Sequence, residues 1–410
     1  MALILYRIIW LFLSPLVFAW SLHQLITRRG GLDYLLERSG LGQRSDRATP
    51  VWFHVASVGE MRLATPLINA VLERGLLITC NTPEAYRLAA STWGDAVTLR
   101  YCPIDYRSFV KRFIGRYTPS LVFIIETEIW PELYEQCHQK DIAIYIVNGR
   151  LSDKTLRSRL ARAWLYPMTL RRISGIWARE EEDASRFAAM GCPPDKIRTT
   201  GSIKMTRRLH SSVPENPLPH RQFALAISTH SGEETAIADA WQRAAGDNPL
   251  VLIPRHPSRA SGVVRSLASR GIAAAQKSFS GDLSLAAQVL VVDAVGQVDA
   301  YCAHASFVFV GGSLVDAGGH NVFEPASWGK AMIVGPHTQN FSAEVDYLSA
   351  HGAINIVQTT EALQDTWHRL THDLAFRTCC ETKARDAHAA LPDRVNDYIQ
   401  LVNTAVNIHT

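Results

Sequence analysis

The sequence predicts an α/β protein built from two doubly wound domains, each with a parallel sheet. Short apolar segments alternate with helical patterns along the chain, which is typical of βαβ units. A proline-rich segment without apolar periodicity, residues 207–220, separates these segments into two series. The length of 410 residues also favours two domains. We therefore expect two Rossmann-like domains that face a cleft.

The expected strands give the domain boundaries. The first series lies at 51–56, 76–80, 97–102, 121–126, 142–148 and 175–179, and the second at 224–229, 249–255, 288–293, 306–313 and 331–336. The predicted division is a first domain at 28–206, a linker at 207–220, a second domain at 221–385, and a terminal helix at 386–410 that packs back on the first domain. Since ligands bind beyond the carboxyl ends of such strands, functional residues are expected there.

The chain begins with a long apolar run. Residues 2–25 carry one charge, Arg7, and arginines follow the run from Arg28 onward. The run is long enough to cross a bilayer, and the positive residues after it place both domains in the cytoplasm. We therefore predict a membrane anchor at 1–27. A buried core helix is the alternative, and Pro15 leaves open a kinked helix that enters one leaflet.

Charge is divided unevenly along the chain. Residues 1–205 hold 27 Lys and Arg against 19 Asp and Glu, whereas residues 206–410 hold 15 against 19, so the balances are +8 and −4. A basic half is expected to meet a membrane, a phosphorylated substrate or nucleic acid. The basic segments 106–116 and 153–172 carry much of the surplus, unless they are only solvated helix faces. No aromatic stacking pattern favours a nucleic-acid partner.

The cysteines argue against a zinc site. The seven are scattered and form no C-x-x-C pair, which favours a reducing compartment. The sequence also lacks the Asp-x-Asp pair of sugar-nucleotide metal sites, a G-x-x-x-x-G-K-[ST] loop, a G-x-G-x-x-G after a strand, and H-E-x-x-H. These absences favour a mechanism without metal.

A carboxylate follows the first strand. Ser57, Gly59 and Glu60 come directly after it and before a helical pattern. Gly59 permits a tight turn, and a carboxylate in the first helical turn is stabilised by the helix dipole. Held at a rigid strand end, Glu60 is also suited to act as a general base on a hydroxyl. The motif alone favours neither interpretation.

Two further carboxylates end the fourth strand. If the chain stays extended, Glu126 and Glu128 lie on one face. A cationic partner or a developing positive charge is then expected nearby, because burial of an unpaired carboxylate is costly. The alternative is a helix-capping acid before Pro131. Lys204 offers an amine near the end of the first domain, although a lone lysine is usually a solvated surface group.

The second domain carries the features of a nucleotide pocket. Arg255 ends a strand and suits a phosphate, and residues 228–234 open a helix whose free N–H groups predict an anion site. In the glycine-rich segment 311–325, glycines allow close backbone approach and Glu324 is placed to accept both hydroxyls of a ribose. A glycine-rich structural turn is the alternative interpretation.

Motifs along nearly the whole chain resemble those of the Kdo (3-deoxy-D-manno-octulosonic acid) transferases of lipopolysaccharide synthesis. They occur in the family's order: HVASVGE, TCNTPEAY, YCPIDYRSFVKRF, IIETEIWPEL, GRLSDKT, TGSIK, STHSGEE, PRHPSR and FVFVGGSLVDAGGHNVFEPASWGKAMIVGPHTQNF. The resemblance implies a GT-B glycosyltransferase at the cell inner membrane. Its first domain would take the tetraacylated, phosphorylated lipid A precursor, and its second domain CMP-Kdo.

The resemblance also implies roles for particular residues. The family's general base falls on Glu60, and its transition-state-stabilising pair falls on Glu126 and Lys204. The CMP-binding positions fall on Pro254, Arg255, Val295, Gly296, Gln297, Asn321, Val322, Phe323 and Glu324. No cofactor or metal is expected.

The sequence departs from the family pattern at two places. Gln297 replaces an acid beside the nucleotide, and its amide hydrogen-bonds without repelling a phosphate. Ala85 replaces a glycine and does not adopt a positive φ cheaply, so the turn on the acceptor side is expected to be rebuilt.

The function expected from these patterns is an inverting, metal-independent transfer of Kdo from CMP-Kdo to a glucosamine hydroxyl of the lipid A precursor. Two alternatives remain. One is a GT-B transferase that uses another CMP-activated ulosonic or sialic acid, or another lipid acceptor. The other is an inactive, membrane-tethered nucleotide-binding paralogue, against which Glu60, Glu126 and Lys204 argue.

Overall fold

The computed structural model describes residues 2–28, 31–44, 47–158, 164–208, 210–219, 221–244, 248–280 and 288–410. The chain forms two compact units. One comprises Met1–Thr206 together with Asp393–Thr410, and the other comprises Arg207–Pro392. Residues 207–219, expected to be a linker, are counted with the second unit, and the chain returns to the first unit at Asp393 rather than at residue 386.

The first unit is built on a parallel sheet of seven strands in the order β3-β2-β1-β4-β5-β6-β7. The strands are β1 (Val51–Val55), β2 (Leu76–Cys80), β3 (Thr98–Tyr101), β4 (Leu121–Ile125), β5 (Ala143–Gly149), β6 (Gly175–Ala178) and β7 (Ile197–Thr199). The order of the strands reverses between β1 and β4. In open α/β sheets such a reversal is where ligands bind, beyond the carboxyl ends of the strands.

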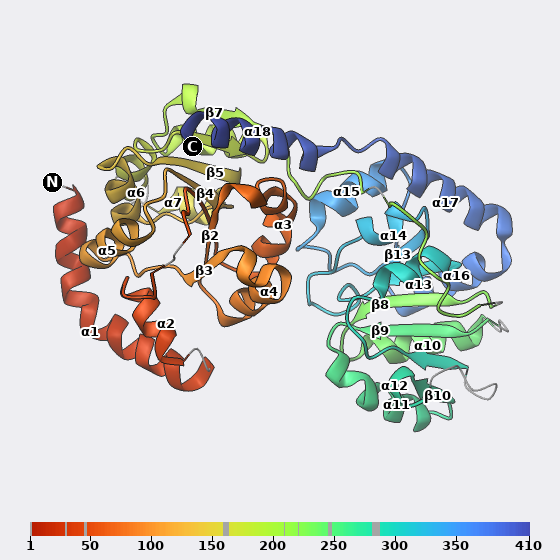
Figure 1. Cartoon of the computed structure of the whole chain (residues 1–410). Coiled ribbons are helices and arrows are strands. Elements are labelled where there is room, and N and C mark those ends of the chain that lie inside the picture. The colour runs from red at the N-terminus through yellow and green to blue at the C-terminus, as the bar shows by residue number, and fades with distance from the viewer. Residues whose placement is uncertain are drawn as a thin grey trace. The chain divides into compact units, whose positions relative to one another are not determined.

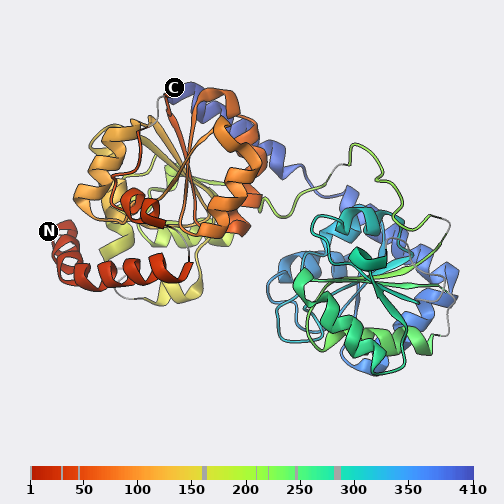
Figure 2. The ribbon, with the colours of Figure 1, turned by 60° about the horizontal axis from the view of Figure 1, so that its bottom comes forward.

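Helices cover both faces of this sheet (Figure 2). They are α3 (Val58–Asn69), α4 (Pro83–Trp93), α5 (Arg107–Tyr117), α6 (Pro131–His138), α7 (Asp153–Arg157), α8 (Tyr166–Leu170), α9 (Glu181–Ala189) and α18 (Arg394–His409). Alternate strand residues point to opposite faces, so Phe53 packs in the core under α3, α4 and α18, and Trp52 packs in the core under α5 and α6. The two buried layers hold the strand ends in fixed positions.

The second unit has its own seven-stranded parallel sheet, in the order β10-β11-β9-β8-β12-β13-β14. Its strands are β8 (Ala224–Thr229), β9 (Leu250–Pro254), β10 (Ala274–Gln276), β11 (Val289–Val291), β12 (Phe307–Val310), β13 (Ala331–Val334) and β14 (Asn355–Ile356). Its helices are α10 (Glu233–Arg243), α11 (Ala260–Ala268), α12 (Lys277–Ser280), α13 (Val298–His304), α14 (Phe323–Ser327), α15 (Ser342–Ala350), α16 (Thr360–His372) and α17 (Leu374–Ala389). Here the strand order reverses between β8 and β12.

The apolar run at the start of the chain forms a helix that packs on the first unit. Helix α1 (Ala2–Arg28) is followed by the short α2 (Gly31–Arg38), and both are labelled in Figure 1. Arg7 of α1 forms an ion pair with the buried Glu132, at 2.9 Å from Nε to Oε2. The Tyr6 hydroxyl donates to Asp105 at 2.7 Å.

The structure does not support the predicted membrane-spanning anchor. Among the described residues, none of the helices has the length and apolar character that a bilayer crossing requires. In the first turns of α1, polar side chains bind acids of the first unit, so one face of the helix lies against protein there.

The eleven expected strands are present, within one or two residues at most ends; the ends at 288–293 and 306–313 are shorter than expected. Three strands were missed, namely β7, β10 and β14, each of two or three residues. The basic segment 153–172 is represented by α7 and α8, and its residues 159–163 lie outside the described part of the chain.

Candidate active site

Glu60 sits in the first turn of α3 beyond the end of β1, and local hydrogen bonds fix its carboxylate. The Ala56 backbone N–H donates to Oε2 at 2.7 Å, and the Ser57 hydroxyl donates to Oε1 at 3.1 Å. Ser57 in turn caps α3 by accepting from the Glu60 N–H at 3.3 Å. Burial raises the pKa of Glu60, although the Ala56 N–H opposes the shift. Its proton affinity therefore suits a base better than that of an ordinary surface glutamate.

Glu126 and Glu128 do not leave β4 as an extended pair. The strand ends at Ile125, and Glu126 adopts a positive φ of 58°, so the chain turns between the two carboxylates. The expectation that both lie on one face of an extended strand is therefore wrong. A non-glycine residue with this backbone conformation is uncommon and occurs most often where function requires it.

The partners of Glu126 are two cations. Lys204 Nζ lies 3.7 Å from Oε1, and Arg150 Nε lies 3.4 Å from Oε2. The Glu126 side chain is 15% exposed, whereas that of Lys204 is 47% exposed. The predicted cationic partner is thus present, and Arg150 is a second one that the sequence did not single out. The sequence feature that could have identified Arg150 is its position directly after β5.

Glu128 belongs to a different network. Its carboxylate accepts from the Trp130 indole at 2.8 Å and from Asn81 at 3.4 Å, and lies 3.9 Å from Nε2 of the fully buried His54. Burial alone would raise the pKa of Glu128, but the positive charge of His54 and the hydrogen bond from Trp130 lower it below the ordinary value. Glu128 is therefore a permanent negative charge beside His54 rather than a base.

His54 connects this network to the core of the sheet. Its Nδ1 lies 2.9 Å from the Thr79 hydroxyl. Burial lowers the pKa of His54, but the neighbouring Cys102 thiol and Glu128 carboxylate outweigh it and raise the pKa to about 10. The positive charge that results opposes the rise in the pKa of Glu60. A buried strand residue is thus part of the electrostatics of the candidate site.

In the second unit, the predicted nucleotide residues gather at the carboxyl ends of neighbouring strands. Pro254 is buried at the end of β9, and Arg255 is exposed directly after it. The Arg255 N–H donates to the Thr229 carbonyl at 3.0 Å, which holds the ends of β8 and β9 together. The guanidinium is therefore presented at the strand ends, where an anionic ligand would meet it.

Beside the anion site expected at residues 228–234, the chain itself supplies a carboxylate. The carboxylate of Glu233 is fully buried and accepts four backbone N–H groups. They belong to His230, Gly312, Ser313 and Leu314, at 2.7 to 3.0 Å. These donors are not available to a phosphate, and Glu233 instead fixes the two loops that follow β8 and β12.

A pair of histidines that sequence reasoning did not assign lies at these loops. The Nε2 atoms of His230 and His320 are 2.8 Å apart, and their rings stack. Burial and the charge of Arg255 lower the pKa of His320 to about 4. Gly312, which has a φ of +70°, lies so close that a Cβ there would be 2.9 Å from the His320 ring. Arg255 is therefore close enough to this pair for its charge to affect His320.

The other predicted nucleotide residues divide between exposed and buried positions. Val295 is 81% exposed, and Gly296 adopts a positive φ of 82°. Gln297 accepts from Lys277 Nζ at 2.5 Å, so the amide that departs from the family pattern has a cationic partner. Val322 and Phe323 are buried and serve as packing residues.

Asn321 and Glu324 lie at the start of α14. The Asn321 side chain accepts from the Phe323 N–H at 3.0 Å. Glu324 is 33% exposed and lies 3.9 Å from Arg208, an arginine that also donates to Asp299 at 2.5 Å. Glu324 therefore faces other charged groups of this unit and remains accessible to a polar ligand.

The other departure from the family pattern, Ala85, changes the form of its turn. Ala85 is a buried residue in the first turn of α4, and its N–H donates to the Thr82 hydroxyl at 3.3 Å. Thr82 is the N-cap of this helix, with Pro83 at its first position. Ala85 has no positive φ, so a capped helix start takes the place of a glycine turn.

Comparisons with known proteins identify the family. Residues 33–207 match the family model described as 3-deoxy-D-manno-octulosonic-acid transferase (kdotransferase). A 3-deoxy-D-manno-octulosonic acid transferase of Bordetella pertussis is 31% identical over 95% of this chain and 96% of its own. The chain belongs to the Kdo transferase family. A second member, from Haemophilus influenzae, is 30% identical over 80% of this chain and 81% of its own.

The relationship to this family makes the chain an enzyme with glycosyltransferase activity. Solved structures give the fold. A UDP-GlcNAc 2-epimerase from Neisseria meningitidis aligns with a TM-score of 0.57 and 13% identity over 86% of this chain and 99% of its own. MurG from Acinetobacter baumannii aligns with a TM-score of 0.53 and 12% identity over 86% and 99%. At these identities the likeness shows the fold alone, which is α/β and GT-B-like.

Proposed function

We propose that the chain transfers Kdo from CMP-Kdo to a hydroxyl of a phosphorylated, acylated glucosamine lipid, with inversion and without a metal. The observation that carries the proposal is the carboxylate of Glu60, fixed at the strand-order reversal of the first sheet with a raised pKa. We propose Kdo as the sugar because the relatives are named as Kdo transferases. We propose CMP as the donor nucleotide and the lipid as the acceptor because of the motif resemblance.

In the proposed mechanism, Glu60 removes the proton from the attacking hydroxyl. The hydroxyl oxygen then forms a bond to the anomeric carbon of Kdo as the bond to the CMP phosphate oxygen breaks. CMP leaves with the bonding electrons and the carboxylic acid of Glu60 retains the proton. Glu126 stabilises the positive charge that develops on the sugar, and Lys204 and Arg255 stabilise the negative charge on the departing phosphate.

The donor residues of the second unit fit a nucleotide monophosphate ester. Arg255 supplies a cation for the phosphate, Glu324 an acceptor for the ribose hydroxyls, and the segment Val295–Gln297 an exposed edge for the base. The choice of CMP-Kdo as the donor rests on the motif resemblance. Because Gln297 stands where the family has an acid, another CMP-activated ulosonic or sialic acid is the second candidate donor.

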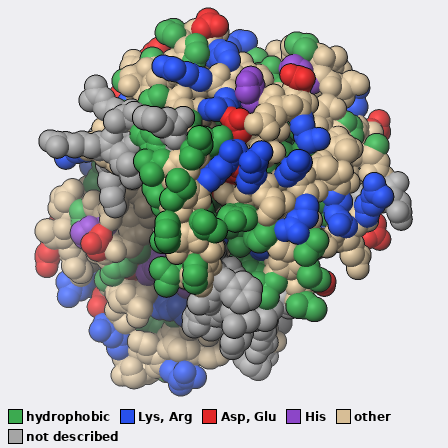
Figure 3. All heavy atoms as spheres, turned by 90° about the vertical axis from the view of Figure 1, so that its left-hand side faces the viewer, with side chains coloured by type: hydrophobic (Ala, Val, Ile, Leu, Met, Phe, Trp, Pro, Cys, Tyr) green, Lys and Arg blue, Asp and Glu red, His purple; other side chains and the backbone are tan. Residues whose placement is uncertain are grey.

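The acceptor side faces a membrane surface in this proposal. Large apolar side chains of α1 and α2 are exposed, among them Phe12 at 78%, Leu16 at 68% and Leu32 at 67%. Figure 3 shows hydrophobic side chains gathered on this face, with Lys and Arg beside them. An apolar face with a basic border is typical of proteins that lie in the interface of an anionic membrane. We therefore propose that the enzyme acts at the cytoplasmic face of the inner membrane.

Calorimetry with a panel of CMP- and UDP-sugars tests the donor. The full chain is expected to bind CMP-Kdo, and Arg255→Ala is expected to weaken this binding at least tenfold. Matched affinity of wild type for a CMP-sialic acid would support the second candidate, and preference for a UDP-sugar would contradict both.

A further inference from the structure

A cavity of about 570 Å³ lies between α1, α2 and the start of α5, and neither Glu60 nor any residue assigned to the nucleotide belongs to its lining. This volume falls in the range of pockets that hold small organic ligands, about 300 to 1,000 Å³. Most of its lining is apolar: Trp10, Pro15, Leu35, Leu36, Ile104 and Phe109. We propose that this cavity binds one acyl chain of the glycolipid acceptor, an inference that rests on the proposed function.

One polar residue of the lining is hydrogen-bonded to the surroundings of the candidate site. Arg38 lines the cavity and donates through Nη1 to the Asn81 side chain and to the Cys102 carbonyl, both at 3.0 Å. Asn81 donates in turn to Glu128 at 3.4 Å, and the negative charge of Glu128 contributes to the raised pKa of Glu60. One residue therefore links the apolar cavity to the network around the candidate base. A chain in the cavity would leave its sugar headgroup on the side of Arg38.

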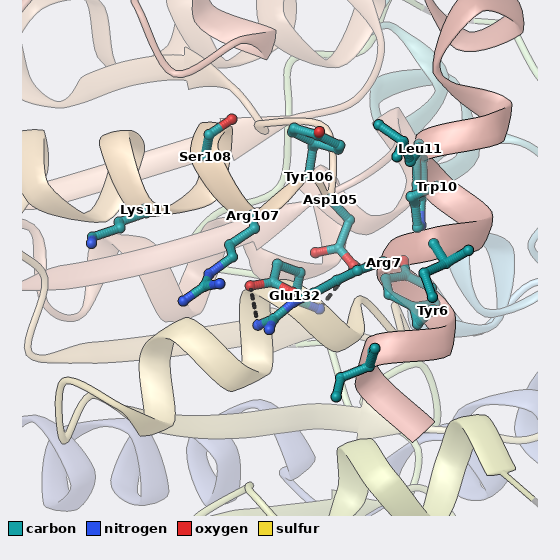
Figure 4. A pocket seen from close by; sticks show the side chains of 12 residues that line it. Tyr6, Arg7, Trp10, Leu11, Asp105, Tyr106, Arg107, Ser108, Lys111 and Glu132 are labelled. Atoms are coloured by element: carbon teal, nitrogen blue, oxygen red, sulfur yellow. Dashed lines mark hydrogen bonds and ion pairs between the residues drawn. The ribbon is translucent and has the colours of Figure 1, made fainter. Parts of the chain in front are cut away.

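A second cavity, of about 480 Å³, shares Trp10 and Tyr106 with the first (Figure 4). Its wall holds the Arg7–Glu132 pair, drawn with dashed lines, and Arg107 and Lys111 reach from α5 beside that pair. Arg107 and Lys111 are exposed and form no ion pair within the described part of the chain. An apolar cavity next to two accessible cations matches a ligand with an apolar chain and a phosphate.

The charge pattern favours the acceptor's own acyl chain over other occupants. A nucleotide or a free sugar would need several polar partners, and among the described residues the only polar side chains in the lining of the first cavity are those of Ser14, Arg38, Ser39 and Tyr106. Burial of apolar chain surface is favourable in proportion to the area removed from water, so a chain of several carbons would add strongly to affinity. The cavity would therefore distinguish acylated acceptors from deacylated ones.

Transfer kinetics test the proposal with two acceptors, the acylated glycolipid in detergent and the same glycolipid after its acyl chains are removed. Ser14→Phe fills the cavity from α1, and Leu36→Asn makes its wall polar. Both side chains are at least partly exposed, so the fold should tolerate the changes. We expect each variant to lower kcat/KM for the acylated acceptor at least tenfold more than for the deacylated one. The matched control Ser91→Phe, on the exposed face of α4, should leave this ratio unchanged.

A second measurement does not depend on transfer. An acyl glycolipid with a photoreactive group on its chain is cross-linked to the full chain in detergent, and labelled peptides are identified by mass spectrometry. The proposal predicts labels on Trp10, Leu36 or Phe109, lost in Ser14→Phe. Labels confined to the outward side chains of α1, such as Phe12, would mean simple membrane contact and would overturn it.

The outcomes separate the two proposals. If wild type transfers Kdo and folded Ser14→Phe keeps the same acceptor ratio, the acyl site is wrong and the proposed function stands. If wild type transfers no sugar to either acceptor but labels the cavity, the proposed function is wrong and the lipid site stands.

Discussion

At the scale of single residues, the pKa of Glu60 results from opposing effects. Burial raises its pKa, whereas the Ala56 N–H and the positive charge of His54 oppose the rise. Two hydrogen bonds fix both oxygens, so the carboxylate keeps one orientation without a bound ligand. A base at a rigid strand end needs this combination, since proton transfer demands both the right proton affinity and the right position.

The first prediction concerns the pH dependence of transfer. Glu60 must be ionised to accept a proton. Because its pKa is raised, kcat/KM should begin to fall with decreasing pH at a pH above the ordinary glutamate pKa of about 4.3. Glu60→Gln should lower kcat by about 10² to 10⁴ and abolish this acid limb. Donor binding, measured by calorimetry, should be unchanged. A Glu60→Gln enzyme that keeps most of its activity would remove Glu60 from the mechanism.

The second prediction separates positioning from stability. Ser57→Ala removes the hydroxyl that caps α3 and also donates to Glu60, so it should cost about 1 kcal/mol of stability and lower kcat several-fold. Thr359→Ala removes the equivalent cap of α16 and is the matched control. Thermal unfolding and steady-state kinetics of both variants provide the check. Equal loss of kcat in the two variants would show that Ser57 acts only through stability.

At the scale of elements, α2 is tied to the sheet by a buried acid. The Tyr101 N–H of β3 donates to Glu37 at 2.7 Å, and Arg100 lies 3.7 Å away. Burial outweighs these partners and raises the pKa of Glu37 to about 7. The folded chain therefore holds a proton on Glu37 at pH values where the unfolded chain has released it. Glu37 makes the attachment of α2 sensitive to pH.

The third prediction follows from this linkage. Between the unfolded pKa of about 4.3 and the folded pKa, the folded state binds more protons, so the free energy of unfolding should fall as pH rises. The stabilisation is fully present below the pKa of Glu37 in the unfolded chain. It is lost once the pH has passed the folded pKa of about 7, which lowers the free energy of unfolding by a few kcal/mol. Denaturant unfolding at pH 5 and pH 8 should show a smaller fall for Glu37→Gln. Parallel pH profiles would contradict the role of Glu37.

Sequence periodicity predicted elements well where burial dominates. All long strands could be predicted from the sequence because each is a continuous apolar run bounded by turn residues. The strands β7, β10 and β14 could not, because two or three residues carry no periodicity and pair only where a neighbouring edge is available. The packing of the first turns of α1 could not be predicted either. The contacts of Tyr6 and Arg7 with acids about one hundred residues away are not detectable in the apolar run itself.

The candidate site was predictable to a similar degree. Glu60, Glu126 and Arg255 were found because a parallel sheet places functional groups directly after strands. The turn at Glu126, the cation Arg150 and the charge on His54 depend on backbone conformation and tertiary contacts, which spacing does not report.

At the scale of the whole molecule, the uneven charge along the sequence corresponds to exposed basic residues on the first unit. The basic half of the sequence contains α5, whose Arg107, Lys111 and Arg112 are exposed on the unit that carries α1. Near an anionic membrane, each such residue contributes about 1 kcal/mol of attraction. The acidic half needs positive charge only around Arg255. The surplus of +8 in residues 1–205 therefore fits a membrane-facing acceptor unit.

The fourth prediction tests this placement. Substitution of Arg107, Lys111 and Arg112 by Glu should weaken binding to vesicles that contain anionic lipid at least tenfold at low salt, with CMP affinity retained. The same substitutions at Arg243, Arg265 and Arg270 of the second unit are the control and should leave vesicle binding unchanged. Vesicle sedimentation measures both. Equal losses in the two triple variants would indicate a general charge effect rather than a membrane-facing unit.

The central claim is that this chain moves Kdo onto a lipid acceptor. Mass spectrometry of the acylated glucosamine phospholipid, after incubation with the purified chain and CMP-Kdo, tests it most directly. The account predicts that the acceptor gains mass in whole Kdo residues, that one CMP is released for each residue gained, and that Glu60→Gln forms product at least a hundredfold more slowly. An acceptor of unchanged mass beside a folded enzyme that binds CMP-Kdo would contradict the account.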